Sequence, residues 1–106
     1  MGLLDRLRGG ARRGTLDRGA DRADVTHLEQ FVATRRGVEG YVEPRTAVTE
    51  TTIVLVAADG EWTRRRIEGP DTARRLSRDL AIPVYDAQVT GYPQRMRDWT
   101  KDHRKR

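Results

Sequence analysis

The strongest strand signal in the chain lies between Thr51 and Ile67, in the run TTIVLVAADGEWTRRRI. Its first part is β-branched and aliphatic on both faces, and such a strand normally lies inside a sheet or is covered on both sides. We therefore expect a central strand here. One face would carry Ile53, Leu55 and Ala57, and the other Val54 and Val56.

A hairpin turn is expected at Asp59-Gly60, because a type I′ turn needs positive φ at both central residues and this pair tolerates it. The return strand mixes charged and apolar residues, so we expect it nearer an edge of the sheet. Trp62, Arg64 and Arg66 would share one face, and Thr63, Arg65 and Ile67 the other.

The length of 106 residues fits one small domain, and 36% hydrophobic against 35% charged residues is polar for a folded protein. We therefore expect part of the chain to lie outside the packed core. The sequence contains no Cys, which excludes disulfides, thiolate nucleophiles and thiolate metal sites. No apolar run approaches the ~20 residues of a membrane-spanning helix.

The net charge of +5 is concentrated at the two ends of the sequence. Residues 1–23 contain six arginines and three aspartates, whereas residues 24–90 contain nine arginines and eleven acidic residues. Residues 91–106 contain six basic and two acidic residues. The middle of the chain is therefore slightly acidic, and the ends are the parts expected to meet an anionic partner.

Residues 1–23 are predicted to form a flexible, basic, Gly/Arg-rich segment. An alternative for its start is a short amphipathic helix that docks on a partner or a membrane surface. The start MGLLDRLRGG has too short an apolar stretch for a secretory signal, so we expect a cytoplasmic protein. The apolar stripe of the alternative helix would comprise Met1, Leu3, Leu4 and Leu7.

The core domain is predicted to span residues 24–99, followed by a basic tail at residues 100–106. A first helix capped by Asp24 would end before Gly37. Residues 38–43 alternate in the manner of a strand, which precedes the central hairpin.

The chain after the hairpin predicts a helix, a strand and a last helix. Gly69-Pro70-Asp71 marks a helix start, and residues 84–89 read as a fourth strand. A strand–helix–strand connection of this length favours a parallel crossover. The order α-β-β-β-α-β plus a C-terminal helix predicts an α+β domain, with the hairpin meander at its centre and helices mainly on one sheet face.

Two classes of nucleic-acid-binding protein share this element order, but this sequence lacks the residues that each class needs. Restriction-endonuclease-like nucleases need two carboxylates for a metal and a lysine on the third strand, where this chain has Thr63. Double-stranded-RNA-binding domains place lysines at a helix start against phosphates, and the corresponding start here, residues 68–71, is acidic. His27 and His103 lie at opposite ends of the predicted structure, so no metal site can be placed; His27 is expected at the surface or as a cap.

Aromatic and basic residues come together in the C-terminal stretch GYPQRMRDWTKDHRKR. Aromatic groups beside arginines suit stacking on unpaired bases, with the charges following phosphates. The alternative is that Met96 and Trp99 pack onto the sheet and leave a solvated basic end. The candidate binding residues are Tyr92, Arg95, Arg97, Trp99, Lys101, Arg104, Lys105 and Arg106.

Three segments, GVEGYVEPRTAV, TTIVLVAADGEW and IPVYDAQVTGYPQRM, give the chain a resemblance to a family of short uncharacterised proteins from actinobacteria. The resemblance covers residues 24–99. It implies an actinobacterial source and a cytoplasmic compartment. Some members carry an oxidoreductase label, but this sequence has no Cys pair and no dinucleotide fingerprint, and the resemblance implies no catalytic residue.

The sequence favours a non-catalytic cytoplasmic interaction protein whose basic ends meet an anionic partner, such as RNA, DNA or a membrane face. No catalytic, cofactor-binding or metal-binding residue is assigned. Two alternatives stay open at this point: a small enzyme, such as an oxidoreductase with an unidentified substrate, and a subunit of a larger protein complex.

Overall fold

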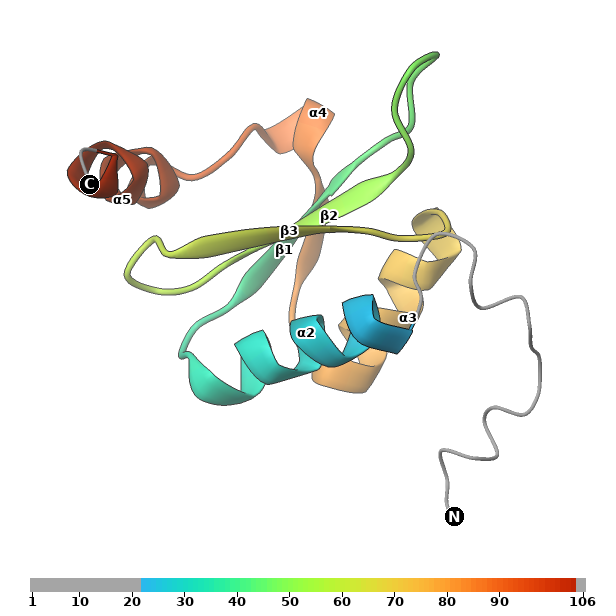
Figure 1. Ribbon diagram of the computed structural model, residues 1–106, viewed down its shortest axis with the longest axis horizontal. Helices are drawn as coiled ribbons and strands as arrows, with labels where there is room; N and C mark the ends of the chain where they lie inside the picture. The colour runs from blue at the N-terminus through green and yellow to red at the C-terminus, as the bar shows by residue number, and fades with distance from the viewer. Residues whose placement is uncertain (1–21, 105–106) are drawn as a thin grey trace.

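The computed structural model describes residues 22–104, which form an α+β domain around a four-stranded mixed sheet (Figure 1). Residues 1–21 of the segment predicted at 1–23, and the predicted binding residues Lys105 and Arg106, lie outside the described residues; residues 22 and 23 belong to the first helix. The elements are α2 (Arg22–Thr34), β1 (Glu39–Glu43), β2 (Thr52–Val56), β3 (Trp62–Arg66), α3 (Pro70–Leu80), β4 (Val84–Asp86), α4 (Ala87–Thr90) and α5 (Gln94–His103).

The strands lie in the order β3-β2-β1-β4. β2 pairs antiparallel with both β1 and β3, whereas β4 pairs parallel with β1. The central position of β2, the edge position of β3 and the parallel crossover through α3 are therefore confirmed. β3 and β4 form the two edges, and α3 carries the chain from one edge to the other.

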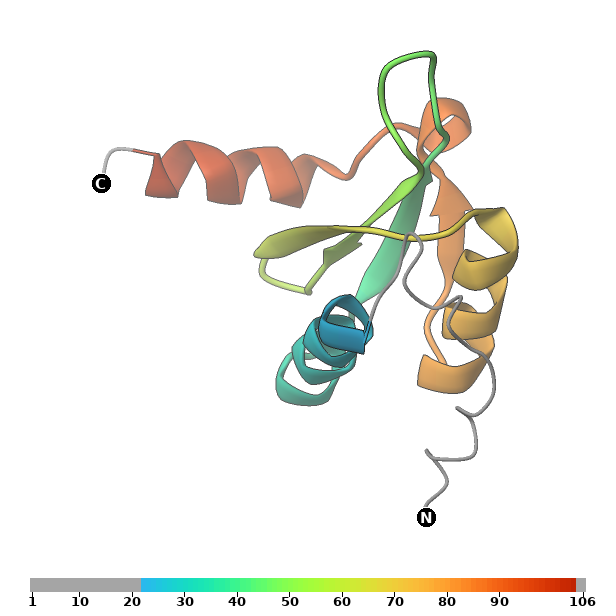
Figure 2. The same ribbon diagram turned by 45° about the vertical axis from the view of Figure 1, so that its right-hand side comes forward.

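β2 is buried on both faces, as its sequence predicts. Ile53 and Leu55 pack under the two longest helices, against Leu28 of α2 and Leu76 of α3. The opposite face, with Val54, packs against a second cluster that includes residues from the C-terminal part of the chain. Figure 2 shows the resulting layers, with α2 and α3 on one side of the sheet and α4 and α5 on the other.

The hairpin turn differs from the expected type I′. Gly60 has φ +99, but Asp59 is not among the described residues with positive φ, where Ala81 is the only non-glycine. The Asp59 carboxylate accepts a hydrogen bond from the Glu61 N–H (2.9 Å), and the Gly60 N–H donates to the Ala57 carbonyl (2.9 Å). This side-chain bond stabilises a longer loop with one left-handed residue, a common three-residue hairpin connection.

Two element boundaries also differ from expectation. α2 begins at Arg22, so Asp24 lies within its first turn rather than capping it, and pairs with Arg65 (3.4 Å). The strand predicted at residues 84–89 ends at Asp86, whose carboxylate accepts a hydrogen bond from the Gln88 N–H (2.8 Å). This cap starts α4 and draws the backbone away from the β1 ladder.

Candidate functional site

Helix α5 is fixed to the face of the sheet opposite α2 by its first turn. Met96 is buried in the cluster that contains Val54 and Val56 of β2. Arg95 donates to Glu39 of β1 (2.8 Å) and to the Ala57 carbonyl oxygen (2.9 Å). The hydrogen bond from Arg95, helped by one from Tyr41, lowers the pKa of Glu39, although partial burial opposes this. Arg95 is therefore engaged within the protein.

The hairpin turn meets the backbone of α5 directly. A Cβ added at Gly60 would overlap the carbonyl oxygen of Arg95 and would lie 2.9 Å from the Cβ of Trp99. Further along, the indole N–H of Trp62 donates to the hydroxyl of Thr100 (2.8 Å). The missing side chain at Gly60 thus allows α5 to dock against the hairpin.

The docking of α5 leaves a basic stripe exposed, formed by Arg97, Lys101 and Arg104. These residues are four and three positions apart, so they follow one side of a helix. Within residues 22–104, the side chains of Lys101 and Arg104 make no ion pair or hydrogen bond, and Arg97 bonds only the Tyr92 carbonyl oxygen (3.1 Å). Of the other eleven arginines among residues 22–104, six pair with carboxylates: Arg35, Arg64, Arg65, Arg74, Arg78 and Arg95.

Aromatic rings lie on the side of α5 that meets the hairpin, because Trp99 is two positions from both Arg97 and Lys101 and so faces away from the basic stripe. Half-buried Trp99 stacks on the exposed ring of His103, with centroids 3.9 Å apart and planes 15° apart. Tyr92 is half-buried and contacts Tyr41 at 6.1 Å between centroids. The described candidate residues therefore divide into two groups: Tyr92, Arg95 and half-buried Trp99 lie on the side of the chain that packs on the domain, and the basic stripe is exposed.

A network of polar side chains joins β1, β3 and the segment before α5. No sequence motif around these residues predicts it. Glu43 of β1 accepts two hydrogen bonds from Arg64 of β3 (2.8 and 2.9 Å) and one from the Tyr92 hydroxyl. Partial burial alone would raise the pKa of Glu43. The bonds from Arg64, Thr52 and Tyr92 outweigh it and lower the pKa to about 2.

We expect Glu43→Gln to make the domain less stable at neutral pH and equally stable in strong acid. A carboxylate whose folded pKa is about 2 stabilises the fold above its unfolded pKa, and this contribution is lost as the pH falls towards 2. With solvent screening of this half-buried group, the loss at pH 7 should be about 1–2 kcal/mol. Urea unfolding at pH 7, 4 and 2 measures it. The exposed Glu68→Gln variant is the control, and equal losses at all three pH values would contradict the assignment.

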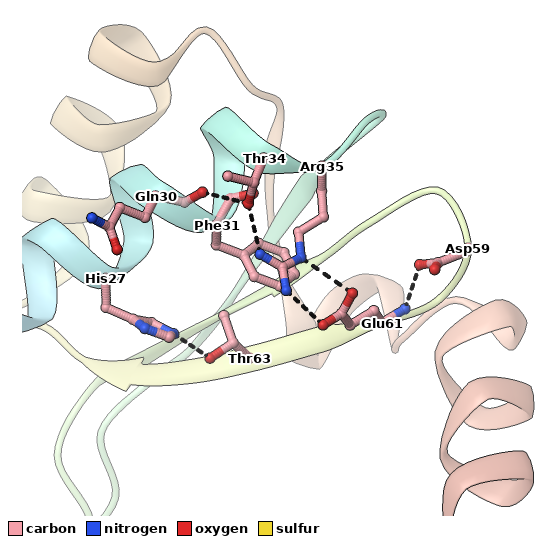
Figure 3. Close-up of polar contacts among 8 residues, drawn as sticks. All are labelled: His27, Gln30, Phe31, Thr34, Arg35, Asp59, Glu61 and Thr63. Atoms are coloured by element: carbon pink, nitrogen blue, oxygen red, sulfur yellow. Dashed lines mark hydrogen bonds and ion pairs between the residues drawn. The ribbon is translucent and has the colours of Figure 1, made fainter.

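A groove lies between α2 and the edge strand β3 (Figure 3). Arg35 bonds both carboxylate oxygens of Glu61 (3.1 and 2.7 Å) and lies over the ring of Phe31, 4.4 Å from its centroid. The half-buried His27 ring bonds the hydroxyl of Thr63 (2.7 Å). His27 is thus a partly exposed residue of the second turn of α2 that bridges this helix to β3, and it does not cap the helix.

The His27 imidazole and the Thr63 hydroxyl form a hydrogen-bonded pair, but no third residue of the described domain orients the imidazole. Burial, followed by the charges of Arg65 and Arg35, lowers the pKa of His27, so its ring is neutral at pH 7. Among residues 22–104, no side chain hydrogen-bonds the second ring nitrogen. A catalytic dyad normally needs such an orienting group, so the geometry supports a structural bridge.

Two further findings concern the described part of the chain. Residues 22–104 contain no group of three or more His, Asp or Glu side chains placed to hold a metal ion. None of the helices in that range is long and apolar enough to cross a membrane.

Comparison with known proteins gives no match to a family model, to a curated protein or to a solved structure. The actinobacterial resemblance therefore stays a prediction.

Proposed function

We propose that this chain is a non-catalytic interaction protein of the cytoplasm that binds single-stranded nucleic acid, RNA foremost, through helix α5. The observation that carries the proposal is the basic stripe, in which Lys101 and Arg104 have no carboxylate partner within residues 22–104. Residues three or four positions apart on a helix have Cβ atoms about 5–6 Å apart, so their charged ends can follow a run of phosphates. The core holds this helix in place, so little ordering is required on binding.

The composition of α5 favours a single strand over a membrane or a duplex. A helix that lies on a membrane has apolar residues next to its basic ones, whereas the exposed side of α5 next to the stripe carries Asp98 and Asp102. These carboxylates would repel the second strand of a duplex. The stacked rings of Trp99 and His103, beyond these carboxylates around the helix, offer a surface for unpaired bases.

Replacement of the stripe should weaken RNA binding without unfolding the domain. We expect the triple variant Arg97→Gln, Lys101→Gln, Arg104→Gln to bind a fluorescent twelve-residue oligouridylate on the order of 10-fold more weakly at low salt, because three phosphate contacts are lost. Anisotropy measures the affinity, and circular dichroism confirms the fold.

The matched control removes the same charge from another helix. Arg74, Arg75 and Arg78 are exposed on α3, and their replacement by Gln should leave the affinity for RNA within about twofold. Equal weakening by both triple variants would show that only net charge matters. Wild-type protein that binds anionic vesicles but no RNA would overturn the proposal.

A further inference from the structure

β3 is an edge strand with half of its backbone groups directed away from the sheet. The Ile67 N–H donates to the Thr51 carbonyl, and the Ala57 N–H to the Glu61 carbonyl (2.9 and 2.8 Å). In an antiparallel ladder the bonded positions alternate. Residues 61, 63, 65 and 67 therefore face β2, and the N–H and C=O groups of Trp62, Arg64 and Arg66 face outward. The Arg64 carbonyl accepts a bond from the Arg65 guanidinium (3.1 Å).

The outward edge borders the groove along α2. One hollow of about 230 Å³ includes Phe31, Trp62 and Thr63, and a second of about 510 Å³ begins at Arg22. The first, which alone includes residues of β3, is the channel beside this edge; the second shares His27 and Gln30 with it but is lined by α2 only. Figure 3 shows the His27 side chain of α2 turned towards Thr63 of β3. A strand added to this edge would place alternate side chains in the channel.

The basic residues of β3 determine which kind of strand can pair with its outward edge. Arg64, Arg65 and Arg66 follow one another along β3. Arg64 pairs with Glu43 and Arg65 with Asp24, whereas Arg66 is exposed with no carboxylate partner among residues 22–104. A second copy of β3 would bring like charges together, which hinders pairing between edges. The basic sequence of residues 1–21 would be repelled in the same way. An acidic strand would instead be attracted.

We infer that the outward edge of β3 and the groove beside α2 bind an acidic peptide in extended form, which joins the sheet as a fifth strand. Its backbone pairs with Trp62, Arg64 and Arg66. Its acidic side chains lie beside Arg64 and Arg66, and the alternate side chains enter the groove over His27 and Gln30. This site is separate from the basic stripe of α5.

The test uses an octapeptide of alternating Val and Glu, blocked at both ends, and the full chain. At saturation, amide exchange followed by NMR should slow at least about tenfold at Trp62, Arg64 and Arg66, because these N–H groups become paired, and should change little at Thr63 and Arg65. Uniform slowing along β3, or none, would overturn the inference. The α5 triple variant should bind the peptide normally, which separates this result from the RNA proposal.

A pair of substitutions at Arg66 gives a second readout. Arg66→Pro removes one outward N–H without loss of a ladder bond to β2, since proline is tolerated at such edge positions. Arg66→Glu reverses the charge. Both should weaken peptide binding at least about fivefold in calorimetry, whereas Arg75→Glu on α3 should not. Equal affinities for all three variants, or tighter binding of oligouridylate than of the peptide at this edge, would contradict an acidic peptide site.

Discussion

Leu55→Ala is expected to lower the free energy of unfolding by about 2–5 kcal/mol, because it leaves a cavity at the centre of the main core. Leu55 is 1% exposed and lies under α2 and α3 in the middle of β2. This loss is a large share of the ~5–15 kcal/mol that stabilises a typical domain. Urea unfolding followed by circular dichroism measures it.

The control for Leu55→Ala is Val48→Ala, at a side chain that is 88% exposed. We expect its free energy of unfolding to change by less than about 0.5 kcal/mol. If Leu55→Ala changed stability as little as Val48→Ala does, β2 would not be the central strand of the core.

Gly60→Ala should separate α5 from the hairpin. The new Cβ would overlap the Arg95 carbonyl oxygen, and alanine is strained at φ +99. Backbone strain of this kind costs about 1–3 kcal/mol, and the displaced helix would also expose Met96. We expect a drop of at least about 2 kcal/mol in the free energy of unfolding, together with a shift of tryptophan fluorescence as the Trp62–Thr100 bond is lost.

Gly69→Ala provides the matched control for Gly60→Ala. Gly69 has an extended backbone, with φ 172, and no heavy atom lies within 4 Å of the Cβ position. Its substitution should change stability by less than about 1 kcal/mol and leave the fluorescence unaltered. A stable Gly60→Ala protein with native fluorescence would show that α5 does not dock on the hairpin.

The sequence predicted the features of the fold that depend on local pattern. The two apolar faces of β2 required a central position, and the mixed faces of β3 suited an edge. The errors came where a side chain competes with the backbone. Asp59 bonds the Glu61 N–H and changes the turn type, and Asp86 caps α4 and ends β4 early. Such bonds favour turns and caps over regular structure. The periodicity of apolar residues does not predict them.

The candidate site was predictable only in part. The aromatic and basic residues of α5 are visible in the sequence, because they follow helical spacing. Their partners are not: Arg95 bonds Glu39 across 56 residues, and Tyr92 bonds Glu43 across 49. The folded structure is needed to distinguish the roles of these residues: Arg95 anchors α5, whereas Lys101 is exposed. The groove beside β3 is likewise built by the packing of α2 against an edge strand.

The most direct test of phosphate binding by the basic stripe of α5 is how RNA affinity depends on salt concentration. Each phosphate contact on a single strand adds about −0.7 to the slope of log affinity against log salt concentration. We expect that replacing Arg97, Lys101 and Arg104 by Gln makes this slope shallower by ~2, whereas the α3 triple variant keeps the wild-type slope. Identical slopes for wild type and the α5 variant, measured with oligouridylate by anisotropy, would contradict a phosphate-binding stripe on α5.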